Sequence, residues 1–450
     1  MANVSNRSLL TGNITRNLLR MALPLMLFNL VNVIYSFVDT FWVGQIGELQ
    51  VGAISIVSTI NLCGTAFVTG LSAAGMALMS KAVGAGDMKR ANHVATVLLN
   101  TSMIIALFIS LAVALFGKPI LNWLNTPADI YDDTYQYLLG LAPDFIFIFI
   151  LTIFQAIRQS CGDSRSGVML NIIAAILNCL LDPLLIFGLN LSMFGASLAT
   201  TLSKLLVCPV AFYVMLKDLQ AIHIDYRRYH FDKAILKEIV TVGLPASTGS
   251  FLLEFGFMIM NRYIVSYGSM IMSAYGLGNR ISSLFYIPVN GLATALTPFI
   301  GQAIGAKNYP LVHKCYRDAM KLGLVVSALT TALGMLFARP MGHFLVRNAS
   351  AELMSNALTY AYYSIGTTVF MAWMNNLLAV FNGSGETSSS LMMNVIRLWA
   401  YRIPLLMFFK NYTALGPLGI WLAMIISNLL ICLTGQTWYL LYFRRKYPDA

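Results

Sequence analysis

Twelve long apolar segments separated by short polar connections constrain this chain more than any other feature. A helix needs about 20 mostly apolar residues to cross the hydrocarbon core of a bilayer. Only 10% of the residues are charged, against roughly 25% in soluble domains. The sequence therefore predicts an all-α integral membrane protein. We place its spans at residues 18–42, 51–79, 91–117, 131–157, 166–188, 194–216, 240–265, 272–303, 315–338, 353–382, 388–410 and 416–442.

The distribution of lysine and arginine predicts the orientation of these spans. The N-terminal segment and every second connection, together with the adjoining ends of the spans, carry 20 basic residues, and the connections on the opposite side, counted in the same way, carry four. Because Lys and Arg accumulate on the cytoplasmic side of membrane proteins, we expect both termini in the cytoplasm, in a bacterial cytoplasmic membrane. The net charge of +11 is thus a signal of topology, and we expect the lipid bilayer and no nucleic acid as a partner.

The two halves of the chain resemble each other on either side of its least apolar connection, residues 217–238. Short motifs recur in the same order, the first two at an offset of 221 residues and the third at 223. They are "LP" at 23–24 and 244–245, "AVGAGDMKRA" (82–91) with "AIGAKNYPLV" (303–312), and "CGDSRSGVMLNII" (161–173) with "SGETSSSLMMNVI" (384–396). Several matches in register indicate an internal duplication.

Each copy contains six spans, an even number, so both copies enter the membrane in the same sense. The sequence therefore predicts a parallel repeat of two six-helix lobes, residues 1–216 and 239–450, joined by a cytoplasmic linker at 217–238. Lobes related in this way suit alternating access, in which one lobe moves against the other around a fixed site.

Apart from Asp132, Asp133 and Asp318, which lie in the first turn of their spans, the predicted spans contain four acidic residues: Asp39, Asp144, Asp182 and Glu254. A charge at the centre of a bilayer costs about 2.5–3.5 kcal/mol on insertion scales, so such groups usually face a cavity or a partner. The alternative is a structural salt bridge with a cation in a span. The candidates for that role are Lys204, Arg262, Arg280, Arg397 and Arg402.

Three of these acids share a helix face with other polar residues, at about 100° per residue. Asp144 has no such stripe and follows a proline, so we give it no functional role. A polar stripe on an otherwise apolar helix is expected where the helix lines a water-filled cavity. The stripes consist of Asn29, Asn32, Ser36 and Asp39 in the first span, Asn171, Asn178 and Asp182 in the fifth, and Ser247, Ser250, Glu254 and Asn261 in the seventh.

Asp39, Asn178 and Asp182 offer oxygen ligands, and Thr200 in the sixth span adds another. If the first and fifth spans are adjacent, these residues form a site for a proton or a small hard cation such as Na⁺. Glu254 is a second candidate for ion coupling. We expect no other metal site, no catalytic residues and no cofactor, because no His/Cys cluster, phosphate-binding loop or hydrolase motif is present.

These motifs resemble those of the multidrug and toxic compound extrusion (MATE) family of cation-coupled antiporters. The similarity extends over residues 9–440 and includes "LLTGNITRNLLRMALPLMLFNLVNVIYSFVDTFWVGQIG" (9–47), "RQSCGDSRSGVMLN" (158–171) and "NCLLDPLLIFG" (178–188). It implies two six-helix bundles and the export of amphipathic, often cationic compounds in exchange for inward H⁺ or Na⁺.

The resemblance also implies roles for individual residues. Asp39 matches the acid of the family's first helix, Asn178 and Asp182 match the N…DP pair of its DinF-like branch, and Thr200 or Thr201 falls near that branch's sixth-helix threonine. Glu254 instead resembles the glutamate of the NorM-like branch, whose cation site lies in the second lobe. The sequence thus leaves open which lobe couples transport to the ion.

Three functions remain in competition. The leading prediction is a monomeric secondary exporter of small amphipathic molecules, with cavity acids that favour positive cargo. The second is a flippase for lipid-linked oligosaccharides from the same superfamily, for which the cavity acids are less suited. The third, an intramembrane enzyme, would use two close acids as a catalytic pair. The absence of a catalytic motif in a duplicated twelve-span chain argues against an enzyme.

Overall fold

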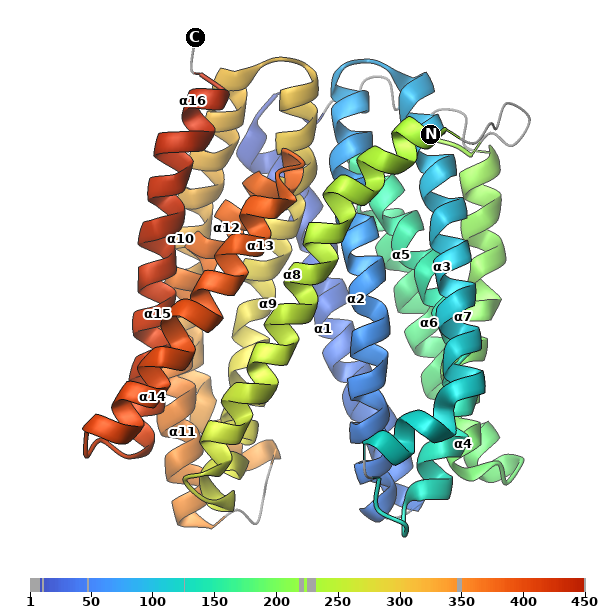
Figure 1. The fold of residues 1–450 in the computed structure, drawn as a ribbon, viewed down its shortest axis with the longest axis vertical. Coiled ribbons are helices and arrows are strands. Elements are labelled where there is room, and N and C mark those ends of the chain that lie inside the picture. The colour runs from blue at the N-terminus through green and yellow to red at the C-terminus, as the bar shows by residue number, and fades with distance from the viewer. Residues whose placement is uncertain are drawn as a thin grey trace. The chain divides into compact units, whose positions relative to one another are not determined.

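The computed structural model describes residues 9, 12–46, 48–124, 126–217, 222–224, 232–345 and 350–448, and all regular structure in these ranges is helical (Figure 1). The first half contains α1 Ile14–Ile46, α2 Glu48–Gly84, α3 Met88–Trp123, α4 Tyr131–Leu141, α5 Asp144–Ser160, α6 Arg165–Pro183, the π-helical η2 Leu184–Gly188, and α7 Ser192–Lys217. The second contains α8 Lys233–Val265, α9 Ser269–Gly305, α10 Tyr309–Leu345, α11 Ala351–Gly366, α12 Thr368–Gly383, α13 Thr387–Val395, η3 Ile396–Arg402 (π-helical), α14 Ile403–Tyr412, α15 Pro417–Trp438, η4 Tyr439–Phe443 (π-helical), and α16 Arg444–Lys446.

The twelve predicted spans all coincide with helices. Ten helical stretches in the described residues are long and apolar enough to cross a membrane, and two bent pairs of shorter helices raise the number to twelve. The pairs are α4 with α5, bent by 45°, and α11 with α12, bent by 47°. Proline lacks an N–H and disfavours helix in the preceding residue, so Pro143 explains the break between α4 and α5. The prediction of an all-α membrane protein is confirmed.

The duplication is visible in the backbone at two connections. Gly86, between α2 and α3, has φ of 75°, and the residue 221 positions later, Lys307, has φ of 54°. Gly162 and Gly385, which are 223 positions apart, have φ of 81° and 76°. Positive φ is uncommon outside glycine, so its recurrence at matched positions shows that both copies use the same turns.

The described chain forms two compact units. Unit 1 contains residues 27–247, and unit 2 contains residues 9–26 together with those from 248 onward. The division by contacts therefore falls within α1 and α8, whereas the repeat in the sequence predicts lobes 1–216 and 239–450. That lobe division and the linker at 217–238 stay a prediction, and residues 218–221 and 225–231 lie outside the described residues.

Within unit 1, α2 packs against α3, α4 and α5, and α7 packs against α4, α5 and α6 (Figure 1). The side chains between them are large and buried, such as Leu98, Phe149 and Phe154. The helix α6 is two-sided, with exposed Ile176 and Leu180 on its apolar face. Exposed apolar side chains of this kind meet lipid in a membrane protein. The opposite face of α6 is therefore the one that carries its polar residues inward.

Within unit 2, α9 packs against α10, α11 and α12, and α12 packs against α15 (Figure 1). The π-helical η3 also packs against α15. These contacts surround an internal cavity, which is described below.

Candidate functional site

A chain of buried hydrogen bonds in unit 1 ends at Asp182. Asp182 is fully buried, and Asn178, one helical turn earlier on α6, is 1% exposed. With its nitrogen facing Asp182, the Asn178 amide donates to Asp182 Oδ2 at 3.0 Å and accepts from the Thr200 hydroxyl at 3.2 Å. Tyr35 on α1 lies 3.3 Å from the same hydroxyl. A chain of donors pointing toward one carboxylate polarises each bond in turn.

Asp39 lies on α1, one turn after Tyr35, and interacts electrostatically with this cluster. Its carboxylate is close enough to Asp182 for the two negative charges to repel each other, and it is attracted to Lys204. The Oδ1 atom of Asp39 is buried and has no hydrogen-bond partner among the residues that the structure describes. Two carboxylates in a buried site, one of them with an unused oxygen, can accept a proton or a small cation.

Lys204 forms a close ion pair in this region with Asp144, the acid to which we assigned no functional role. Its ammonium nitrogen on α7 lies 2.6 Å from Asp144 Oδ2 at the start of α5. The Asp144 side chain is 3% exposed and that of Lys204 is 20% exposed. This pair corresponds to the structural salt bridge that we considered for intramembrane acids. It leaves Asp39 and Asp182 without a direct cationic partner among the described residues.

The remaining candidates in unit 1 do not join the cluster. The Asn171 amide donates to Gly167 O at 2.9 Å and approaches Gln155 Oε1 at 3.4 Å, so it ties α6 to α5. On α1, Asn29 is half-buried and Asn32 is exposed. The side chain of Ser36 lies outside the described residues.

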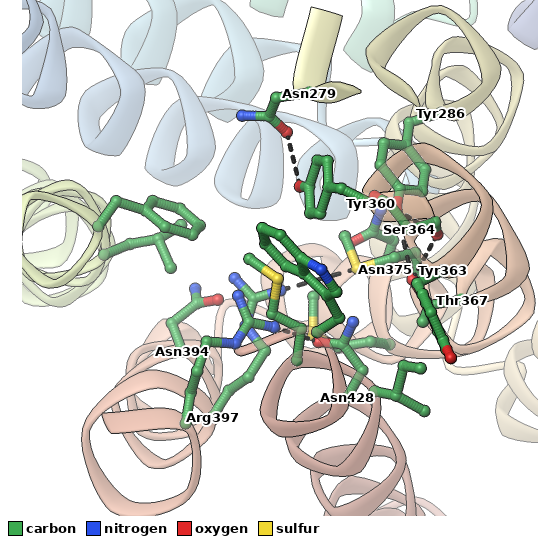
Figure 2. Close-up of a pocket in the computed structure, with 18 of the residues that line it drawn as sticks. Asn279, Tyr286, Tyr360, Tyr363, Ser364, Thr367, Asn375, Asn394, Arg397 and Asn428 are labelled. Carbon is green, nitrogen blue, oxygen red and sulfur yellow. Dashed lines mark hydrogen bonds between the residues drawn. The ribbon is translucent and has the colours of Figure 1, made fainter. Parts of the chain in front are cut away.

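Unit 2 contains a half-open cavity of about 570 Å³, a volume typical of small-molecule sites. Two predicted residues line it, Glu254 and Asn261, and the buried Oδ1 of Asn261 has no hydrogen-bond partner. Ser250 on α8 is half-buried and is not among the lining residues. Figure 2 shows Asn394, Arg397 and Asn428 on one side of the cavity, and Tyr286, Ser364 and Thr367 on the other. The lining also includes Tyr275, Tyr360, Met371, Arg402 and Trp421.

The sequence identified Arg397 and Arg402 only as possible salt-bridge partners, and the structure places both at this cavity. Their position inside a span could have identified them as functional candidates, because a charged side chain of either sign within the membrane is usually functional. Tyr35 carried no comparable signal, since tyrosine is common in apolar helices.

No group of three or more His, Cys, Asp or Glu side chains suited to a metal ion occurs in the described part of the chain. The cluster of unit 1 has two carboxylates, a neutral amide and a hydroxyl. Oxygen ligands of this kind suit a proton or Na⁺. Two carboxylates are too few charged ligands to bind a divalent ion tightly.

A polytopic helical protein with repeated halves, buried intramembrane acids and an internal polar cavity has the construction of a secondary transporter. The MatE family model matches residues 24–184 and 245–408, once in each half. The chain belongs to this family, the MATE transporters. The two matches begin 221 residues apart, in agreement with the duplication.

Relatives and solved structures match nearly the whole chain. "Probable multidrug resistance protein YpnP" of Bacillus subtilis is 27% identical, with 93% of each chain covered. The "FAD transporter" of Shewanella oneidensis is also 27% identical, with 94% of each chain covered. The fold is similar to that of a solved structure described as "Outward-facing conformation of a multidrug resistance MATE family transporter of the MOP superfamily", with a TM-score of 0.91, 23% identity and 97% of each chain covered.

Proposed function

We propose that this protein exports amphipathic compounds, often cationic ones, in exchange for inward H⁺ or Na⁺. The observation that carries the proposal is the fully buried Asp182, bonded to Asn178 and repelled by Asp39. Such an arrangement is unfavourable as long as both carboxylates are charged, and one bound proton or Na⁺ relieves the repulsion. Relatives named as multidrug resistance and export proteins support the direction of transport.

Ion binding at this cluster can bias the conformation of the transporter. A ligand shifts an equilibrium only by its difference in affinity for the two states. The cluster joins α1 to α6 and α7 through Tyr35, Thr200 and Asn178, so a bound ion acts on three helices at once. We propose that Asp39, Asn178, Asp182 and Thr200 couple the ion to transport, as in the DinF-like branch.

Glu254 stays a second candidate for ion coupling. It lines the cavity of unit 2 and forms no ion pair within the described part of the chain. Its likeness to the NorM-like branch motivates the assignment. Because the cluster of unit 1 has hydrogen-bonded partners in place, we assign coupling to that cluster first.

The alternative functions differ in their cargo or chemistry. A flippase would move a lipid headgroup, and an intramembrane enzyme would use Asp39 and Asp182 as a catalytic pair. The chain belongs to a family of transporters, and we propose that it is no enzyme. One relative is named as a transporter of FAD, so the cargo of this chain has to be argued from its own cavity.

Accumulation of ethidium and fluorescein in cells with and without the protein tests the proposed export. We expect the cells with the protein to retain less of at least one dye. A protonophore or a sodium ionophore should abolish the difference, and the effective ionophore identifies the coupling ion. Export that survives the collapse of both gradients, or equal retention of both dyes with and without the protein, would contradict secondary transport.

We further propose a monomer in the bacterial cytoplasmic membrane with both termini inside, since each unit contains its own complete site. In a background without the six native cysteines, Tyr226→Cys in the connection at 217–238 should resist an impermeant thiol reagent added to intact cells. Lysed cells provide the positive control. Ready labelling of intact cells would reverse the orientation.

A further inference from the structure

The cavity of unit 2 holds two buried arginines that no acid neutralises. Arg397 and Arg402 are each 4% exposed. Arg402 donates to Ser427 Oγ at 3.0 Å and to Asn428 Oδ1 at 2.6 Å, both neutral acceptors. Within the described ranges, Arg397 donates a hydrogen bond to the sulfur of Met371 at 3.8 Å, and its Nε atom has no hydrogen-bond partner. Among the described residues neither guanidinium forms an ion pair.

Such an arrangement is costly unless something compensates the charge. An ionised side chain buried without a counter-charge is strongly unfavourable, and arginine keeps its proton in proteins. The two guanidinium groups also repel each other. Glu254 is the one acid that lines the cavity, and it pairs with neither arginine. The cavity therefore offers an unused binding site for an anion.

The local backbone brings the two arginines together. They are five residues apart on the π-helical segment Ile396–Arg402. Five residues of α-helix would turn them about 140° apart, whereas the i→i+5 pattern of a π-helix brings such residues nearer to one face. When Pro183 and Pro404 are aligned, "NCLLDP" (178–183) corresponds to "WAYRIP" (399–404). In the first half, Asp182 directly precedes the proline. In the second half, Arg402 stands two residues before the matching proline, so the repeat has an acid in one copy and a base at the adjacent position in the other.

Aromatic side chains form another part of the cavity wall. The rings of Tyr275 and Trp421 are stacked, with centroids 6.2 Å apart and planes 5° apart. Tyr360 lies against both, at 4.5 Å from Trp421 and 5.0 Å from Tyr275. The positive charge of Arg402 interacts electrostatically with Tyr275 and Tyr360. Flat aromatic surface next to an arginine suits a flat ligand that carries a negative group.

We propose that this cavity binds an aromatic compound through a carboxylate or phosphate group held by Arg397 and Arg402. The inference rests on the proposed export and names the cargo of that function. A guanidinium fork binds such groups with two parallel, charge-assisted hydrogen bonds. For this cavity, anionic or zwitterionic cargo replaces the positive cargo expected from the sequence. The acids of unit 1 serve the coupling ion, and Glu254 can meet the positive end of a zwitterion.

Binding of fluorescein, an aromatic anion, to the purified full-length protein in lipid-free detergent micelles tests this proposal. Fluorescence anisotropy at one fixed pH should show saturable binding. Arg397→Met and Arg402→Met should each weaken it about tenfold or more, because each removes a charge-assisted hydrogen bond to the anion. Apolar replacement of a buried charge is often tolerated, so we expect both variants to fold. The matched control Arg262→Met removes an exposed arginine of the same unit that does not line the cavity, and it should bind fluorescein as tightly as the unmodified protein.

Unchanged affinity in the methionine variants, or a preference of the unmodified protein for ethidium over fluorescein, would overturn the proposal. If the methionine variants do not fold, Arg397→Lys and Arg397→Gln replace them. The lysine variant keeps the charge without the planar fork and should bind more tightly than the glutamine variant, and equal affinities would contradict the anion site.

Competition with phospholipids identifies the source of the anionic group. Displacement of fluorescein by an anionic phospholipid, but not by a zwitterionic one, would identify a lipid headgroup as the occupant of the arginine site. Absence of displacement would support a soluble compound. Since these measurements use no ion gradient, a failure here leaves the export proposal intact, and a failure of export leaves the binding result intact.

Discussion

Asp182→Asn is expected to abolish gradient-driven export while the protein inserts and accumulates at its normal level. Asparagine keeps the shape of the side chain and some of its hydrogen bonding to Asn178, but it cannot take up a proton and offers no charge to a cation. Dye retention should rise to that of cells without the protein. Asp39→Asn should give the same result, because Asp39 supplies the other half of the like-charge repulsion.

Protein level and thermal stability decide how a loss of export by Asp182→Asn is interpreted. Asn171→Ala provides a matched control on α6, since its amide contacts only Gln155 and Gly167 away from the cluster. Normal export by Asp182→Asn at equal protein level would remove the coupling role. Loss of the protein itself would instead assign Asp182 to the structure of unit 1.

Lys204→Met is expected to destabilise unit 1 strongly. Removing one member of a buried ion pair leaves the other charge without compensation, at a cost of about 3–5 kcal/mol. Here the remaining charge would be Asp144, whose side chain is 3% exposed. The melting temperature of the purified protein in detergent should fall clearly. Adding Asp144→Leu to Lys204→Met should restore most of the loss, because the pair is then replaced by apolar side chains.

An exposed ion pair in the same unit gives the control for this effect. Arg90 pairs with Glu238 at 2.9 Å, and the two side chains are 52% and 41% exposed. Surface pairs contribute between about 0 and 1 kcal/mol, so Arg90→Met should change the melting temperature little. If Lys204→Met and Arg90→Met had equal effects, the Lys204–Asp144 pair would have no special structural role.

Much of the fold could be predicted because a bilayer imposes a strict length on apolar helices. The twelve spans and the duplication follow from that rule and from repeated motifs. The breaks were harder to place: Pro143 indicates the bend between α4 and α5, whereas the bend near Thr367 has no proline to signal it. The division of contacts within α1 and α8 depends on packing between distant helices, and a single sequence carries no direct signal of it.

The candidate site was predictable where one helix carries the signal. Asn178 and Asp182 are four residues apart on one face of α6, and the structure joins them through a hydrogen bond. Asn171 shares that helix face by periodicity, yet it bonds to its own helix and to α5. Arg397 and Arg402 were visible as intramembrane charges. Their common orientation depends on a π-helical segment, which helical periodicity alone does not reveal.

The central claim, that Asp182 couples an ion to the movement of cargo, is tested most directly in proteoliposomes. Vesicles are loaded with the dye that the protein exports, and entry of H⁺ or Na⁺ is recorded as the dye leaves. The unmodified protein should show ion entry that depends on the dye, and Asp182→Asn should show none at equal protein density. Dye-dependent ion entry through Asp182→Asn at the rate of the unmodified protein would contradict the claim.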